Sequence, residues 1–161
     1  MKTFKFPIVP LTIAAAIAGV LMLPSLPGPL QAQFIPAASV TGTWVQIVTL
    51  EGQTPFNGVI TFSSDGTVTD TTQADVLGPD LASPGHGVWQ NVSATKVQFK
   101  LIKFLSVAGT GAPDGAQVFD GIITLKDAND YSGTGAVVVV SASGQSGPKV
   151  TFTWVGKRMV L

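Results

Sequence analysis

The chain has 161 residues, of which 45% are hydrophobic and 11% are charged, with nine basic residues, nine acidic residues and no cysteine. This length suits one domain, and the absence of cysteine excludes disulfide bonds and a cysteine nucleophile. The balanced charge excludes the basic surface that binding to nucleic acid or to an anionic membrane requires.

The first 32 residues have the layout of a secretory signal peptide. Lys2 and Lys5 precede an apolar run over residues 11–23, and helix-breaking prolines and the small Ala32 follow it. We predict a signal peptide over residues 1–32 with cleavage near Ala32, a linker over residues 33–40, and export to the periplasm or the extracellular space. The alternative is an uncleaved membrane anchor, but 13 apolar residues are few for a span of about 20. We therefore predict no stable membrane insertion after cleavage.

The remaining sequence shows short β-branched and aromatic runs, separated by Gly, Asp, Asn, Ser and Pro, and no helical periodicity. Asp65-Gly66 is typical of a hairpin turn. The runs predict eight strands, over residues 42–50, 58–62, 67–72, 87–92, 96–107, 116–126, 131–142 and 149–161. Most connections are short, so strands that follow one another should pair. We predict an all-β domain over residues 41–161, an eight-stranded antiparallel up-and-down barrel that pairs every strand edge. An open β-sandwich is the alternative.

The register of one hairpin can be predicted from its loop. If the loop after residue 107 is centred on residues 111–112, Lys103 faces Asp120, Leu101 faces Ile122, and Phe99 faces residue 124. Lys103 and Asp120 would then form an ion pair near the loop. This pair either lies on the exposed surface or lies at the barrel rim, where it would orient a polar group of a ligand.

The motif Gly42-Thr43-Trp44 resembles the glycine-x-tryptophan motif in the first strand of lipocalins and their calycin relatives. The resemblance implies that Trp44 closes the floor of the barrel and that Arg158, after the last strand, packs across its ring. The helix and the cysteines typical of lipocalins are missing, which makes the chain more similar to compact bacterial barrels, including the allene oxide cyclase barrel. The stretch from residue 58 to residue 89 also resembles small secreted bacterial proteins without an assigned activity.

His86 is the single histidine, and it lies between two glycines in "SPGHG". We interpret this stretch as a turn at the barrel rim that leads into a strand; the alternative is that His86 contacts a ligand there. One histidine without cysteine is a poor donor set for zinc, so we predict no metal site and no cofactor. The loop aspartates, Asp75 among them, are expected to cap backbone N–H groups.

Aromatic residues occur on nearly all of the predicted strands, and alternation directs several of them inward. The family resemblance favours an interior cavity for a small hydrophobic molecule, although a solid core would give the same pattern. The residues predicted to line this cavity are Phe62, Trp89, Phe99, Leu101 and Tyr131.

Three functions are therefore open at this stage, and no catalytic residue is assigned. The first is an exported barrel that binds a small hydrophobic molecule and is not an enzyme. The second is a barrel-type cyclase or isomerase for an apolar substrate, with Tyr131 or Asp120 enclosed as its polar residue. The third is a structural or interaction protein with a solid core.

Overall fold

The computed structural model describes residues 39–77 and 80–160. The predicted signal peptide and most of the predicted linker lie outside the described residues. In chain order, the elements of the described part are β1 (Gly42–Leu50), β2 (Phe56–Phe62), β3 (Thr67–Thr72), the 3-10 helix η1 (Gln73–Val76), β4 (Asp80–Ala82), β5 (Gly85–Asn91), β6 (Lys96–Val107), β7 (Pro113–Leu125), β8 (Asp130–Ser141) and β9 (Ser146–Arg158).

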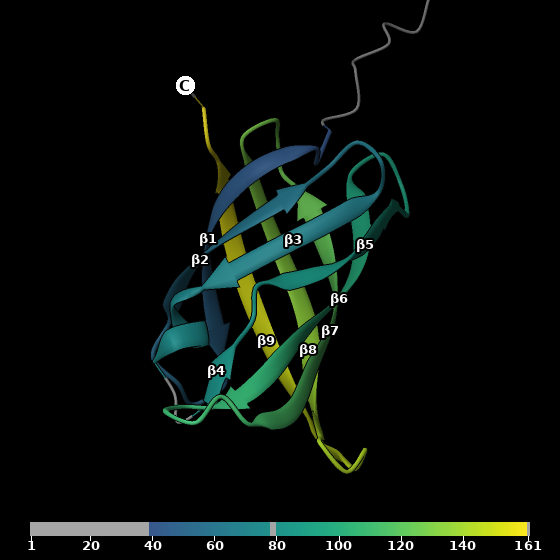
Figure 1. Cartoon of the computed structure of the whole chain (residues 1–161). Helices are drawn as coiled ribbons and strands as arrows, with labels where there is room; N and C mark the ends of the chain where they lie inside the picture. The colour runs from purple at the N-terminus through teal and green to yellow at the C-terminus, as the bar shows by residue number, and fades with distance from the viewer. Residues whose placement is uncertain (1–38, 78–79, 161) are drawn as a thin grey trace, which may run out of the picture. The chain divides into compact units, whose positions relative to one another are not determined.

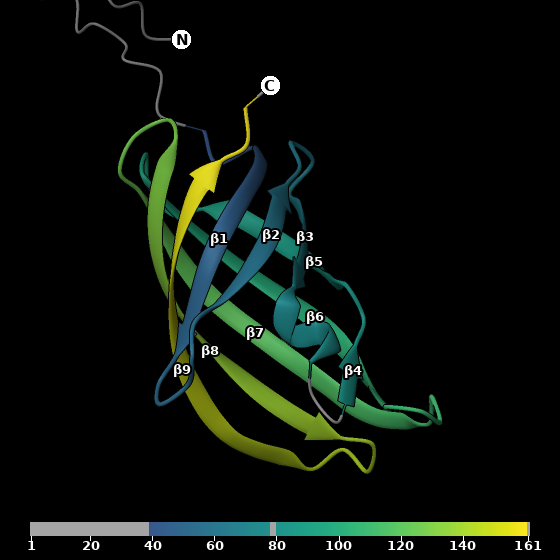
Figure 2. The same ribbon diagram turned by 90° about the vertical axis from the view of Figure 1, so that its left-hand side faces the viewer.

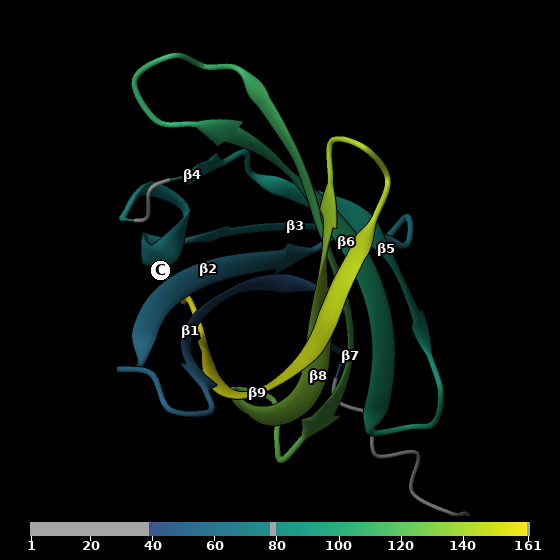
Figure 3. The same ribbon diagram turned by 90° about the horizontal axis from the view of Figure 1, so that it is seen from below.

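Eight of the strands form a closed antiparallel barrel. Each pairs with its neighbours in the order β6-β5-β3-β2-β1-β9-β8-β7, and the additional pairing of β6 with β7 closes the ring. Figure 3 shows these strands surrounding a common interior. The predicted all-β, eight-stranded barrel is confirmed. The ninth strand, β4, was not predicted; it pairs with the end of β6.

The two ends of the barrel differ in the elements that they carry (Figures 1 and 2). One end is formed by the start of β1 and the end of β9, and we call it the Trp44 end. At the other end lie η1, β4 and the hairpin between β6 and β7, and we call it the cavity end. The strands run between these ends, so each inward side chain has a fixed depth in the interior.

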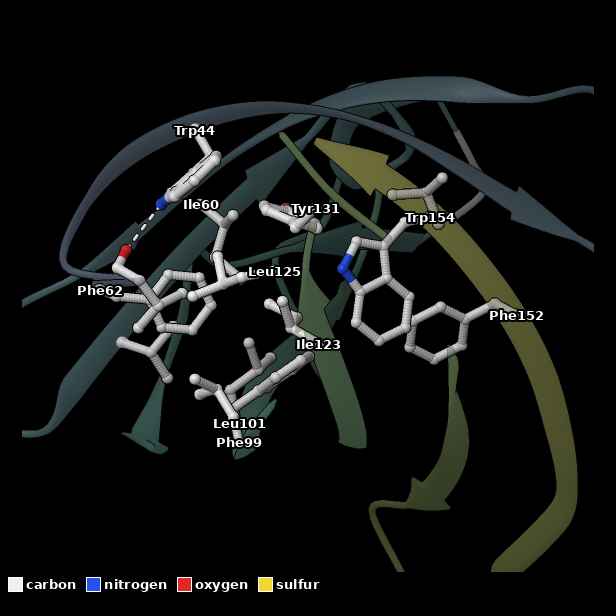
Figure 4. Packing of buried hydrophobic residues seen from close by; sticks show 14 of the residues in the cluster. Trp44, Ile60, Phe62, Phe99, Leu101, Ile123, Leu125, Tyr131, Phe152 and Trp154 are labelled. Atoms are coloured by element: carbon white, nitrogen blue, oxygen red, sulfur yellow. Dashed lines mark hydrogen bonds between the residues drawn. The ribbon is translucent and has the colours of Figure 1, made fainter. Parts of the chain in front are cut away.

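Inward and outward side chains alternate along β6, as the pleat of a strand requires. Val97, Phe99, Leu101, Lys103 and Leu105 are buried, whereas the residues between them are exposed or half-buried. Most of the buried side chains are apolar and form one core (Figure 4). Lys103 follows the same alternation, so a lysine takes an inward position next to that core.

The predicted pairing of Lys103 with Asp120 is wrong. Lys103 pairs with Gln117, and Asp120 pairs with Lys100. The loop is centred before the predicted residues 111–112. The N–H of Val107 donates to the carbonyl of Ala112 at 2.9 Å, so the loop turns between these two residues. A bulge between residues 105 and 106 moves the register back by one residue, so that Lys103 faces Gln117.

The register error spans three residues, an odd number, and therefore exchanges the two faces of the strand. Asp120 lies on the outer face, where its carboxylate is 3.9 Å from Lys149 Nζ. Leu101 faces Phe119 where Ile122 was predicted, and Phe99 faces Gly121 where residue 124 was predicted.

The sequence "SPGHG" does not form the predicted turn, because β5 already begins at Gly85. Gly85 pairs with Asp70 and His86 pairs with Thr69. Gly87 permits the close approach of β5 to β6, since a Cβ atom there would lie 1.9 Å from the carbonyl oxygen of Lys100.

Among residues 39–77 and 80–160, no helix has the length and apolar character needed to cross a bilayer.

Candidate functional site

Trp44 and Arg158 are brought together at the Trp44 end. Trp44 is fully buried, its Nε1 donates to the carbonyl of Val40 at 2.8 Å, and Arg158 Cζ lies 4.2 Å from the centre of its ring. The guanidinium also donates to the carbonyls of Ser39, Thr41 and Ala128. These contacts close this end of the barrel. They also show that Ser39 and Val40, predicted as linker, pack against the domain.

Three of the predicted cavity residues fill the core near this end. Tyr131 meets Trp44 edge-on, with ring centroids 4.9 Å apart. Phe62 meets Trp89 edge-on at 6.0 Å, and Trp89 Nε1 donates to the carbonyl of Ser63 at 2.9 Å. Figure 4 shows Tyr131 and Phe62 among the packed side chains. None of the three predicted residues lines the cavity described next.

A cavity of about 340 Å³ occupies the interior toward the cavity end. Phe99 and Leu101, the other two predicted residues, line it. A volume of this size is within the range of small-molecule sites. The other apolar side chains of its wall are Val48, Leu50, Phe56, Ile60, Ala74, Ala82, Leu105, Phe119, Val137, Val139, Phe152 and Trp154.

Four of the lining aromatic rings form a continuous wall. Trp154 stacks on Phe152 at 4.9 Å and meets Phe99 edge-on at 5.6 Å, while Phe119 meets Phe152 at 5.9 Å. Gly133 leaves room for the indole, because a Cβ atom there would lie 2.5 Å from the Trp154 ring. Trp154 Nε1 is buried and has no hydrogen-bond partner among the described residues.

A buried ionic cluster lies on the other side of the cavity. Lys103 Nζ is 2.7 Å from Asp70 Oδ2 and 2.7 Å from each carboxylate oxygen of Asp75. The side chain of Lys103 is only 1% exposed. All three residues line the cavity. They come from β6, β3 and η1, so the cluster also holds η1 against the barrel interior.

Hydrogen bonds extend this cluster across the barrel. Gln46 Nε2 donates to Asp70 Oδ1 at 2.7 Å, and the Tyr131 hydroxyl donates to Gln46 Oε1 at 2.9 Å. Asp75 also accepts from the backbone N–H of Thr72 at 2.7 Å and from its hydroxyl at 2.9 Å. The expected capping by Asp75 is thus present, but the same carboxylate binds Lys103. We call Gln46, Asp70, Asp75 and Lys103 the polar cluster.

The polar cluster holds two carboxylates and one ammonium. Burial raises the pKa of the Asp70 carboxyl above its usual range, against the opposing effect of Lys103. Burial, and then the nearby Asp70, raise the pKa of the Tyr131 hydroxyl, which therefore stays protonated at neutral pH. With both aspartates ionised, one negative charge is uncompensated, and removing such a charge from water costs free energy.

The remaining predicted site residues lie elsewhere. His86 and Asp120 are exposed on the outer face of the barrel, whereas Lys103, predicted near the rim, is buried in the interior. Within residues 39–77 and 80–160, no group of three or more His, Asp or Glu side chains is placed to hold a metal ion.

Sequence reasoning missed Gln46 and Asp70, although alternation identifies both. Gln46 lies between Trp44 and Val48 in the inward positions of β1, and Asp70 lies two residues after the inward Val68. A polar residue at an inward position of a predicted strand is the signal that finds them.

The comparisons with known proteins concern other β-barrels. The chain is similar to a redesigned beta barrel, b11L5F_LGL, at 15% identity and a TM-score of 0.44, with 77% of this chain and 95% of that chain covered. It is also similar to EF1p2_mFAP2b bound to DFHBI, at 16% identity and a TM-score of 0.48, with 74% and 93% covered. No protein-family model matches the chain, and no curated protein matches it.

Proposed function

We propose that this protein is an exported carrier that binds a small, largely apolar molecule in its barrel. The observation that supports this function best is the cavity of about 340 Å³ with an apolar wall on one side and the polar cluster on the other. Such a combination is typical of small-molecule sites, where apolar surface supplies affinity and a few polar groups fix orientation.

Ligand binding in the cavity can be tested by placing a larger side chain in its wall. Val137 lines the cavity and is 8% exposed, whereas Val155 lies on the outer face and is 48% exposed. We expect the protein to enhance the fluorescence of the neutral apolar probe N-phenyl-1-naphthylamine. The V137F variant should bind this probe at least tenfold more weakly, and V155F should bind it as the wild type does. Equal binding by the two variants, or no binding by the wild type, would contradict the proposal.

Export is part of the proposal and rests on the sequence of residues 1–32. The resemblance to lipocalin-like secreted barrels agrees with it. Expression of the full chain in a bacterium, followed by mass spectrometry of the periplasmic fraction, tests this part. We expect a product that begins near Gln33. Recovery of the uncleaved chain from the cytoplasm would contradict export without affecting the cavity.

A cyclase or isomerase is the second candidate, because an acid–base group with a raised pKa lies in an apolar cavity. That group is Asp70, since Asp120 lies outside the barrel and Tyr131 does not line the cavity. Turnover of polyene or epoxide substrates, followed by NMR, separates the two functions. An enzyme would convert such a substrate and lose this activity in D70N, whereas a carrier would return the substrate unchanged.

A further inference from the structure

We propose that the cavity selects a molecule with a cationic head group, a protonated amine on an apolar body, and that the Asp70 carboxylate binds this head group. This inference rests on the proposed carrier function, and it adds the chemical class of the ligand.

The N–H donors of Lys103 are already used. An ammonium has three N–H bonds, and Lys103 Nζ has three carboxylate oxygens at 2.7 Å, one from Asp70 and two from Asp75. The Lys103 side chain is also only 1% exposed. Lys103 therefore offers no free donor to an anionic ligand, even though it is the cation in the cavity wall.

The Asp70 carboxylate can still accept hydrogen bonds. A carboxylate has about four acceptor sites. Asp75 uses four, two toward Lys103 and two toward Thr72. Asp70 uses two, toward Lys103 and Gln46. The Asp70 side chain is 8% exposed and lines the cavity. A ligand that meets Asp70 must therefore supply a donor.

The charge of the cluster favours a donor that is also positive. Two carboxylates face one ammonium, so a single cationic head group brings the ionised cluster to neutrality. Because burial raises the pKa of the Asp70 carboxyl, this carboxyl takes up a proton as the pH falls. At higher pH a cationic ligand compensates the same negative charge. An anionic ligand would add a third negative charge to a poorly solvated site.

The rest of the wall suits a cation as well. The face of an aromatic ring attracts a positive charge, and Lys103 Nζ already lies 5.8 Å from the centre of the Phe119 ring. Phe99, Phe152 and Trp154 continue this aromatic wall around the same cavity.

The experiment compares three probes with one shape and different charge: 1-naphthylmethylamine, 1-naphthylmethanol and 1-naphthoate. Binding to the purified protein is measured by isothermal titration calorimetry at pH 7. We expect the amine to bind at least tenfold more tightly than the alcohol, and the carboxylate to bind more weakly than both. D70N should bind the amine and the alcohol equally. D120N, which changes a carboxylate on the outer face, should keep the preference for the amine.

The pH dependence gives a second readout that needs no variant. The groups that face Asp70 are Lys103 from β6, Asp75 from η1 and Gln46 from β1, with Tyr131 beyond Gln46. Amine affinity should fall as the pH is lowered and Asp70 takes up a proton, while alcohol affinity should stay constant. If the alcohol binds as tightly as the amine at pH 7, the cationic head group is wrong and the carrier function stands. If none of the three probes binds, both proposals fail.

Discussion

Lys103 Nζ lies 2.7 Å from both carboxylate oxygens of Asp75, although the two residues are 28 positions apart and belong to different elements. This contact anchors η1 to the interior wall of β6. It also compensates one of two buried carboxylates, so the stability of the barrel should depend strongly on Lys103.

Replacing Lys103 with methionine keeps an unbranched side chain, one atom shorter, and removes its charge. We expect K103M to destabilise the protein by about 3–5 kcal/mol at pH 7, because two buried carboxylates lose their cation. The loss should shrink as the pH is lowered, since protonation removes the uncompensated charges. Urea unfolding at pH 7 and pH 5 measures both effects.

A lysine on the outer face is the matched control for that variant. Lys149 is 60% exposed and 3.9 Å from Asp120, and K149M should change the stability by less than about 0.5 kcal/mol. Equal effects of K103M and K149M would show that the buried cluster contributes no more than a surface ion pair.

Replacing Asp70 with asparagine removes the excess charge of the cluster. The network can adapt, because the amide of Gln46 and the amide of the introduced asparagine can both reverse, and the Tyr131 hydroxyl can accept instead of donating. We therefore expect D70N to be at least as stable as the wild type at pH 7, as measured by urea unfolding. A large loss of stability would show that the ionised carboxylate stabilises the fold.

The pH dependence of stability should identify Asp70 by its sign. Its pKa in the folded state is above the ordinary value of 3.8, so the folded state keeps the proton to higher pH. The resulting stabilisation is present at low pH and is lost as the pH rises through the folded pKa. Wild type should therefore gain stability relative to D70N as the pH falls from 7 to 4.

Asp65 gives the opposite sign and serves as a control. Hydrogen bonds from the side chain and the backbone of Thr67 lower the pKa of the Asp65 carboxyl. The stabilisation by Asp65 is present at neutral pH and is lost as the pH falls through its folded pKa. Wild type should therefore lose stability relative to D65N over the same range. Two slopes of the same sign would contradict the assignment.

Replacing Arg158 with alanine should open the Trp44 end. The guanidinium stacks on Trp44 and donates to the carbonyls of Thr41 and Ala128. We expect a loss of about 1–3 kcal/mol, from the cation–π contact and the charged hydrogen bonds. Thermal unfolding followed by circular dichroism measures it. The neighbouring K157A, which changes an 82% exposed lysine, should leave the transition unchanged.

Replacing Gly133 with alanine should displace the Trp154 indole, since the new Cβ atom would lie 2.5 Å from the ring. Overpacking of this kind costs about 1–3 kcal/mol, and an indole pushed inward reduces the cavity. We expect a changed near-UV circular dichroism spectrum and weaker binding of N-phenyl-1-naphthylamine. At Gly147 the nearest atom to a new Cβ, a backbone oxygen, is 3.3 Å away, so G147A should keep the spectrum and the binding.

Turn residues and β-branched runs were sufficient to predict the eight barrel strands, because each hairpin is a local feature of the sequence. Their closure into a ring was predicted from the need to pair the two edge strands. The register of β6 on β7 was not predictable in this way. It depends on where the loop after Val107 turns and on a bulge next to Leu105, and neither has a distinctive residue pattern. An error there placed Asp120 opposite Lys103, where the structure has Gln117.

The polar cluster could be predicted in part. Gln46, Asp70 and Lys103 each occupy an inward position of a strand, so alternation alone indicates three polar side chains in the interior. Asp75 could not be predicted to join them. Its position depends on how η1 folds over the end of the barrel, and the sequence of a single turn indicates only its capping role.

The seam between β1 and β9 has a consequence for the order in which the protein folds. Trp44 pairs with Arg158 there, 114 positions apart, while most other pairings join strands that follow one another. Contacts between distant segments form slowly, because the long loop between them must close first. The local hairpins can form first, but the ring closes only when β9 pairs with β1, so the barrel interior is completed last.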